Sequence, residues 1–178
     1  MNELSLHILD LAQNCIRAEA TLMKISIIEE DDNLNLIIED NGFGMDEATL
    51  KNVLSPFYTS RTTRKIGLGI PLFKDLCELT GGNFSIKSIK NVGTIIDCNV
   101  NMASIDSLPL GNIIETIYIL SINETDCDLE FIHQKNGKSY IYNTKEIKEV
   151  LNGIPLTEYS VKCWIEEYLL QNEELINS

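Results

Sequence analysis

The opening segment repeats apolar residues with the period of a helix. They recur at three- and four-residue spacing over residues 4–18, and Ser5 is placed to cap the first turn. We therefore predict an amphipathic helix there, with Asp10 and Asn14 one turn apart on a shared face. His7 is predicted to lie on the surface of the same helix.

Two pairs of apolar segments have the composition of strands. Residues 22–29 and 34–40 are rich in Ile and Leu and flank a short acidic turn. Residues 84–89 and 94–101 repeat this arrangement across a turn that contains glycine. Both pairs predict antiparallel hairpins.

The segment between the hairpins divides into a helix, a loop and a second helix. Asp46 is placed to cap a short helix that runs to residue 54, whereas residues 55–66 contain Pro56 and show no apolar period. Helical spacing returns over residues 68–80, and the glycine pair that follows supplies a stop. The apolar face expected for this second helix consists of Leu72, Leu76 and Leu79.

The C-terminal part has its own series of elements. A linker at residues 107–109 precedes a helix over residues 112–120, a hairpin that turns near residues 134–137, and two further helices. Asn143 is placed to cap the first of these two helices.

The length of the chain bounds its organisation. Its 178 residues suffice for one full-sized domain, or for a domain of about a hundred residues with an appendage. The order of elements predicts an α+β fold with one domain over residues 1–102. A small α+β region over residues 103–178 is expected to serve as a structural extension or a partner-binding part.

Composition narrows the classes of partner. The formal charge of -13 disfavours binding to nucleic acid or anionic membranes, because phosphate neutralisation requires clustered Lys and Arg. The five cysteines are scattered and never spaced as CxxC, so neither a disulfide framework nor a zinc site is indicated. With no long apolar run either, we expect a cytoplasmic protein whose cysteines are reduced core residues.

The string Asp-Asn-Gly-Phe-Gly-Met at residues 40–45 has the composition of a nucleotide pocket. A site that selects adenine needs a buried acceptor for the exocyclic amine, and Asp40 closes an apolar strand. Gly42 and Gly44 let the backbone approach the ring, and Met45 offers a polarisable surface. The same string is also typical of a simple hairpin turn, so both interpretations stay open here. A calcium loop is set aside because apolar residues stand where ligand oxygens are required.

Asp10 and Asn14 supply the polar chemistry of the opening helix. An Asn amide oxygen suits Mg²⁺, whose other positions phosphates and water can fill. Asp10, one turn earlier, can accept a proton from an attacking water or hydroxyl. The alternative is two polar residues on the solvated side of an amphipathic helix.

The second helix is preceded by glycines and cations. Gly67-Leu68-Gly69 can cradle phosphates through backbone N–H groups at the helix N-terminus. A dinucleotide fingerprint is excluded because no strand leads into the glycines and Leu72 replaces the third one. The preceding cations are concentrated in an otherwise acidic chain and are expected to neutralise triphosphate charge; they are Arg61, Arg64 and Lys65.

Together these motifs resemble the ATP site of the GHKL, or Bergerat-fold, ATPases, which include histidine kinases, DNA gyrase, Hsp90 and MutL. The resemblance covers residues 1–102, and the motifs occur along the chain in the order typical of the family. The N box corresponds to residues 10–14, the first glycine box to residues 40–44, and the second to residues 67–70. The lid corresponds to residues 57–66, and Val92-Gly93-Thr94 match the glycine and threonine that lead a later strand.

The resemblance implies a two-layer α/β sandwich that binds ATP and Mg²⁺ between helices and a lid. Asp10 takes the catalytic position and Asn14 that of the metal ligand. Family members that hydrolyse ATP usually carry glutamate where this chain has Asp10, so its carboxylate is one methylene shorter. The nucleotide-binding residues that the resemblance implies are Asn14, Arg17, Asp40, Gly42, Gly44, Met45, Arg64, Lys65, Gly67, Leu68, Gly69 and Thr94.

The resemblance also implies a cytosolic protein kinase or ATPase that acts in trans on an unidentified protein partner or substrate. The alternative is a regulatory module, similar to anti-sigma factors, in which ATP occupancy changes a partner surface without turnover. A homodimer is compatible with either function. The C-terminal region resembles that of small stand-alone bacterial ATP-binding proteins.

Overall fold

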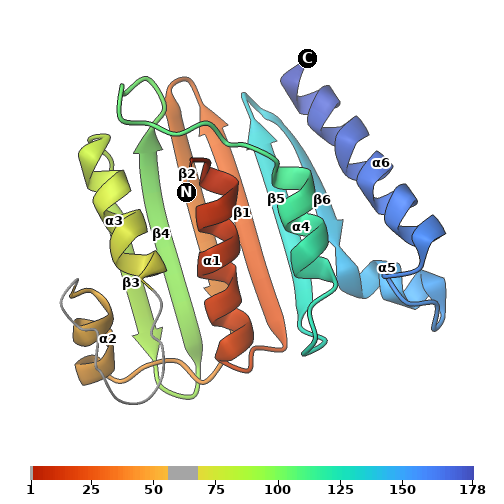
Figure 1. Ribbon diagram of the computed structural model, residues 1–178, viewed down its shortest axis with the longest axis horizontal. Helices are drawn as coiled ribbons and strands as arrows, with labels where there is room; N and C mark the ends of the chain where they lie inside the picture. Colours follow the sequence, from red (N-terminus) through yellow and green to blue (C-terminus); the bar gives the residue numbers. More distant parts are fainter. Residues whose placement is uncertain (1, 56–67) are drawn as a thin grey trace.

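The computed structural model describes residues 2–55 and 68–178, and it contains one six-stranded sheet with helices packed on one face (Figure 1). The described helices are α1 (Leu4–Arg17), α2 (Glu47–Val53), α3 (Gly69–Leu79), α4 (Ile113–Ser121), α5 (Thr144–Leu151) and α6 (Tyr159–Asn177). The described strands are β1 (Leu22–Glu30), β2 (Asn33–Asp40), β3 (Phe84–Ile89), β4 (Gly93–Asn101), β5 (Asp128–Lys135) and β6 (Lys138–Asn143).

The sheet mixes antiparallel and parallel pairs. Its strands lie in the order β3-β4-β2-β1-β5-β6, and all neighbours are antiparallel except β1 and β5, which run parallel. Helices α1, α3 and α4 lie across this sheet in Figure 1, so helices and strands form two layers. The predicted α+β sandwich and its hairpins are confirmed.

The core lies between these two layers. Ile25 and Ile38 point toward the helices and are fully buried, whereas their neighbours Lys24 and Glu39 point to the opposite face and are exposed. This alternation is what a sheet with one covered face requires. The apolar face of α1 fills the other side of the core, and each of its buried Leu or Ile side chains contributes roughly 1.5–3 kcal/mol; they are Leu4, Ile8 and Leu11.

The surroundings of α1 correct two predictions. Ser5 does not cap the helix. Glu3 occupies the N-cap position, and Ser5 lies buried within the first turn. His7 is only 6% exposed, and its ring lies 5.5 Å from that of Phe73, so it belongs to the interface with α3 rather than to the surface. Burial lowers the pKa of His7, which favours a neutral ring.

The buried face of α3 also differs from the prediction. Leu72 and Leu79 are 47% and 64% exposed, and Leu76 is only partly buried. Helical spacing fits two adjacent faces of this helix equally well, and packing against α1 and β4 selects the other one. The buried residues of α3 are Gly69, Ile70, Pro71, Phe73 and Cys77. The predicted stop is confirmed, since Gly81 has a φ of 84°.

The C-terminal region continues the same sheet. β5 pairs with β1 along its whole length, and the Leu4 N–H donates to the Pro109 carbonyl at 2.9 Å. Thr116 on α4 also donates its hydroxyl to the Ser5 carbonyl at 3.3 Å, which joins α4 to α1. The division into two domains near residue 102 stays a prediction; the sheet extends across it.

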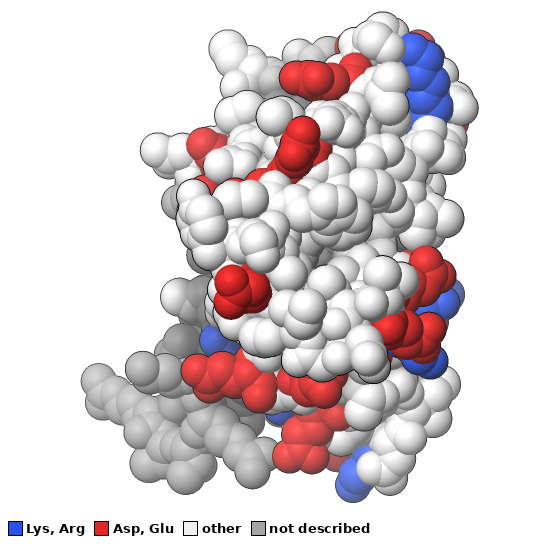
Figure 2. Space-filling model, turned by 90° about the vertical axis from the view of Figure 1, so that its right-hand side faces the viewer, with Lys and Arg blue, Asp and Glu red and all other residues white. Residues whose placement is uncertain are grey.

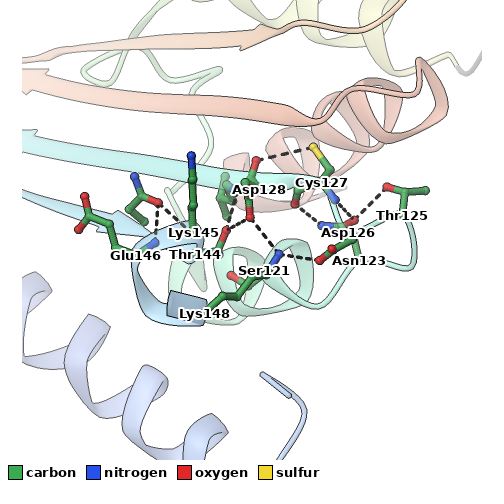
Figure 3. A network of polar contacts seen from close by, with 12 residues as sticks. Ser121, Asn123, Thr125, Asp126, Cys127, Asp128, Thr144, Lys145, Glu146 and Lys148 are labelled. Atoms are coloured by element: carbon green, nitrogen blue, oxygen red, sulfur yellow. Dashed lines mark hydrogen bonds and ion pairs between the residues drawn. The ribbon is translucent and has the colours of Figure 1, made fainter. Parts of the chain in front are cut away.

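A polar corner joins α5 to the start of β5 (Figure 3). Lys148 on α5 bonds Asp126 at 2.7 Å and Asp128 at 2.9 Å. The Thr144 hydroxyl accepts the Leu129 N–H at 2.8 Å. Asn143 caps α5 as predicted, because its side chain accepts N–H groups of the first turn. These bonds hold α5 against the start of β5.

A buried histidine fastens α6 to the sheet. His133 on β5 is 0% exposed, and its Nδ1 lies 2.6 Å from Glu173 on α6 while its Nε2 lies 2.8 Å from Glu29 on β1. The Tyr140 hydroxyl donates to the same Glu173, and Lys135 pairs with Glu29 at 3.4 Å. Burial alone would lower the pKa of His133, but its hydrogen bonds to the two glutamates raise it.

This arrangement predicts pH-dependent stability. Because the folded pKa of His133 lies above the ordinary 6.5, its contribution is complete below that value and is lost as pH rises through the folded pKa. We expect His133→Gln to cost on the order of 2 kcal/mol at about pH 6, and less at higher pH. Urea unfolding of both proteins across pH measures this difference. Parallel curves for wild type and variant would contradict the assignment.

Candidate functional site

The polar face of α1 carries the first group of predicted site residues. Asp10 and Asn14 are partly buried, and Arg17 is exposed one turn further along. The Arg17 guanidinium donates to the Asn14 amide oxygen at 3.1 Å. The amide oxygen of Asn14, the predicted metal ligand, therefore already accepts a hydrogen bond from a cation. This oxygen faces outward, toward the exposed Arg17 side chain.

Asp40, at the end of β2, lies on the helix side of the sheet. It has the same strand parity as buried Ile38, and its carboxylate accepts the Gly42 N–H at 2.8 Å. The Cys15 thiol of α1 lies beside this carboxylate. Burial raises the pKa of Asp40, and the Gly42 hydrogen bond offsets part of the rise. This is the environment expected of a recognition carboxylate at the edge of a pocket.

The glycine turn after Asp40 packs against the end of α1. A Cβ on Gly42 would stand 2.5 Å from the Ala18 carbonyl oxygen, so only glycine fits there. The Phe43 N–H donates to that same carbonyl at 2.9 Å. Gly44 has a φ of 59°, and a Cβ there would collide with the Ile89 carbonyl. Close backbone packing, as well as turn geometry, therefore requires both glycines.

Residues that sequence reasoning missed hold this turn in place. The Ser88 hydroxyl accepts the Met45 N–H at 2.8 Å and lies 2.8 Å from the Thr94 hydroxyl. The Asn41 amide oxygen accepts the Thr21 N–H at 2.9 Å, which ties the turn to the start of β1. An Asn next to glycine in a turn is a sequence pattern typical of such a side-chain hydrogen bond to the backbone. The role of Ser88 depends on strand register, so no local sequence pattern indicates it.

The N-terminus of α3 meets α1 at Asp10. A Cβ on Gly69 would collide with the Asp10 carboxylate, so this glycine admits the acid against the first turn of α3. Leu68 stands at the N-cap position, 53% exposed, with a side chain that cannot accept from the first N–H groups. The predicted site residues Arg64, Lys65 and Gly67 lie outside the described residues.

Three motifs far apart in the sequence therefore meet at one place. Contact between Cys15 and Asp40 joins α1 to the end of β2, contact between Ala18 and Gly42 joins it to the glycine turn, and Asp10 joins it to α3. Asn14 lies between these contacts along α1. The roles assigned to these residues stay predictions, but the structure brings their elements together.

A cavity of about 280 Å³ lies at the same end of the sheet. Two predicted site residues, Asp40 and Thr94, line it together with Ser88. Its other walls include Lys24 and Glu39, whose positions along their strands place them on the uncovered face of the sheet. The cavity therefore reaches Asp40 and Thr94 from the edge of the sheet.

The residues at the meeting point suit a nucleotide with a divalent ion. Asp40 is an acceptor for an amine, and the N-terminus of α3 offers N–H groups and a positive dipole end to phosphate. Asn14 is a neutral oxygen ligand, in keeping with Mg²⁺, which takes most of its ligands from phosphates and water. Over residues 2–55 and 68–178, no three His, Cys, Asp or Glu side chains cluster as a metal cage.

Comparison with known proteins identifies the domain. Residues 2–104 match the family described as histidine kinase-, DNA gyrase B-, and HSP90-like ATPase. The sensor histidine kinase YvrG of Bacillus subtilis is 31% identical over 93 residues, which is 49% of this chain and 16% of YvrG. The sensor protein kinase FleS of Pseudomonas aeruginosa is 40% identical over 58 residues, 32% of this chain and 14% of FleS.

A solved structure is similar over part of the chain. The catalytic domain of histidine kinase ThkA aligns with a TM-score of 0.41 and 22% identity, covering 55% of this chain and 64% of that one. The curated relatives are several times longer than the part this chain matches.

The packing of the glycine turn predicts a stability defect. Gly42→Ala places a methyl group 2.5 Å from the Ala18 carbonyl oxygen and 2.7 Å from the Ala18 Cβ, neither of which is the end of a flexible side chain. We expect a loss of about 1–3 kcal/mol in urea unfolding. Gly137→Ala measures the other cost of replacing a glycine, because a Cβ there meets no atom within 4 Å while φ is 84°, whereas Gly42 has no positive φ. A loss well below about 1 kcal/mol in Gly42→Ala would show that the α1 contact does not matter.

Proposed function

The chain belongs to the histidine kinase-, DNA gyrase B- and HSP90-like ATPase family, and on that premise we propose that it binds Mg-ATP and acts in trans on a protein partner as a kinase or ATPase. The domain itself is one that binds ATP. The observation that carries the proposal is the convergence of Asp40, Asn14 and Asp10 at one end of the helix layer. The proposal goes beyond ATP binding, because it also assigns the metal ion, the catalytic residue and the kind of partner.

Asp40 would recognise the adenine end of the nucleotide. Its carboxylate is held on the helix side by the Gly42 N–H, which leaves acceptor capacity for the exocyclic amine. Gly42 and Gly44 keep the turn close to α1, and Met45 follows them with partly buried apolar surface. Thr94 pairs with Asp40 in the sheet and would complete this end of the site.

The phosphates would lie between α1 and α3. Asn14 would hold Mg²⁺ through its amide oxygen, and Arg17, which now donates to that oxygen, is near enough to turn toward a phosphate instead. Leu68 and Gly69 begin α3, whose first N–H groups suit an anion. The cations Arg64 and Lys65, with Gly67, are proposed to complete phosphate binding from the segment before α3.

Asp10 is the proposed general base. It lies one helical turn from Asn14 and against the start of α3, so it would face the terminal phosphate, where positioning is the main catalytic task. A water or hydroxyl attacking in line would transfer its proton to this carboxylate.

The same contact favours a second candidate function. Asp10 is packed against Gly69, and it is one methylene shorter than the glutamate expected from the family resemblance. Both features limit its reach, which supports a regulatory module that binds ATP and changes a partner surface without turnover. Turnover by the isolated chain decides between the two.

Assembly and location are further parts of the proposal. The cysteines are free, and four of them are buried while Cys163 is exposed, which corrects the expectation that all belong to the core. Free thiols support the proposed cytoplasmic location. Among the described helices, none has both the length and the apolar character needed to cross a bilayer.

The partner is proposed to be a protein, and a homodimer is one form of the active assembly.

Adenine recognition predicts a binding defect. Asp40→Asn replaces an acceptor oxygen by an NH₂ group that faces the amine, and we expect ATP affinity to fall at least about a hundredfold by calorimetry. Glu39→Gln is the matched control, since it changes the neighbouring residue on the uncovered face. Unchanged affinity in Asp40→Asn would refute the adenine assignment.

Catalysis by Asp10 predicts a separation of binding from turnover. Asp10→Asn keeps the side-chain shape but removes the proton acceptor, so we expect ATP affinity within about threefold of wild type and a loss of phosphate release or transfer of about a hundredfold or more. Asp75→Asn, on the exposed side of α3, is the control. If wild type releases no phosphate and phosphorylates no partner, the regulatory function is supported instead.

A further inference from the structure

Helices α4 and α6 enclose a groove of about 550 Å³. Tyr118 is 7% exposed and forms part of its floor, while Ile119 on α4 and Leu170 on α6 are 40% and 48% exposed. A volume of this size lies in the range of specific binding pockets. The groove therefore offers apolar surface along two helices, away from the residues assigned to the nucleotide.

The rim of the groove is acidic. Glu115 on α4 and Glu166 and Glu167 on α6 line it, and Lys162 is the single cation among its described lining residues. Lys162 is already engaged, because its ammonium lies 3.8 Å from Glu166. Figure 2, viewed from the α6 side, shows acidic side chains spread over this surface, with Lys and Arg sparser. The unpaired charge at the groove is negative.

The floor of the groove already holds a cation. The Lys162 ammonium stands 5.3 Å from the centroid of the Tyr118 ring, within the range of a cation–π contact. A Lys or Arg supplied from outside would instead meet the two carboxylates that Lys162 does not pair with, those of Glu115 and Glu167, which accept hydrogen bonds from the neutral amides of Asn112 and Gln171.

We propose that this groove docks an amphipathic helix of a protein partner, with Lys or Arg on the flanks of its apolar face. α4 and α6 line the groove with exposed apolar residues, Ile119 and Leu170, which suits the helix-in-groove mode, in which anchors at three- and four-residue spacing enter the groove. Glu115 and Glu167 would pair with the flanking cations. The proposal rests on action through a protein partner but not on ATP turnover.

Charge argues against other occupants. Nucleic acid and anionic membrane surfaces would be repelled by the carboxylates at the rim. A second copy of this chain also carries a net charge of -13, so two copies repel each other at the same face. A basic segment gains from the same charges, and its association is expected to weaken as salt is added.

Two synthetic peptides test the proposal on the full chain. Both form an amphipathic helix with the same leucine face; one carries lysine on its polar face and the other glutamate. Calorimetry at low and high salt measures their affinity for the protein. We expect the lysine peptide to bind, with affinity that falls as salt rises, and the glutamate peptide not to bind.

Variants localise the interaction. Glu115→Gln combined with Glu167→Gln, and separately Leu170→Ala, are each expected to weaken the lysine peptide about tenfold. The matched controls are Glu149→Gln combined with Glu174→Gln, and Leu175→Ala, which change exposed residues outside the groove. ATP affinity is measured in parallel and is expected to stay unchanged in all of them.

The outcomes separate this proposal from the proposed function. No binding, equal binding of both peptides, or equal losses in groove and control variants would overturn the docking surface while ATP binding persists. A dimer that dissociates in the groove variants would assign the face to a second copy and would also overturn it. If the wild-type chain does not bind ATP, that result would instead count against the proposed function alone.

Discussion

The proposed nucleotide site depends on the close approach of the turn after β2 to the end of α1. Gly42 lies against the Ala18 backbone, and its N–H holds the Asp40 carboxylate on the helix side of the sheet. This contact brings a buried acid from a strand to the helix that carries Asn14 and Asp10. Without it, Asp40 would lie apart from α1, and the proposed site could not bring the three motifs to one ligand.

Much of this arrangement was predictable from sequence because its determinants are local. The strand hairpins follow from apolar alternation, the helix caps from Asp46 and Asn143, and the helix stop from Gly81. The glycines at 42 and 44 also mark their own sites, because close backbone approach leaves no alternative residue. The order of the motifs then indicates that they converge.

The features that escaped prediction depend on contacts between distant segments. The buried face of α3 is selected by α1 and β4, so helical spacing alone could not identify Phe73 and Cys77. His7 is buried because it packs against Phe73 of α3, a contact between distant segments that the sequence of its own helix does not indicate. The link from Ser88 to Met45 depends on register across a turn. The continuation of the sheet through β5 was likewise hidden, since a parallel partner leaves no local signal.

Helix α1 connects the proposed nucleotide site to the acidic groove. α1 carries the polar residues of the proposed nucleotide site. α4, which forms one wall of the acidic groove, is hydrogen-bonded to α1 through Thr116 and Ser5. His133 fastens α6, the other wall, to β1 and β5. The groove is therefore built on elements that also frame the nucleotide site.

A crystal structure with Mg²⁺ and a non-hydrolysable ATP analogue tests the central claim most directly. The account predicts the adenine amine within hydrogen-bonding distance of the Asp40 carboxylate, the metal on the Asn14 amide oxygen, and the terminal phosphate near Asp10. A nucleotide seated on the uncovered face of the sheet, beside Lys24 and Lys87, would contradict it.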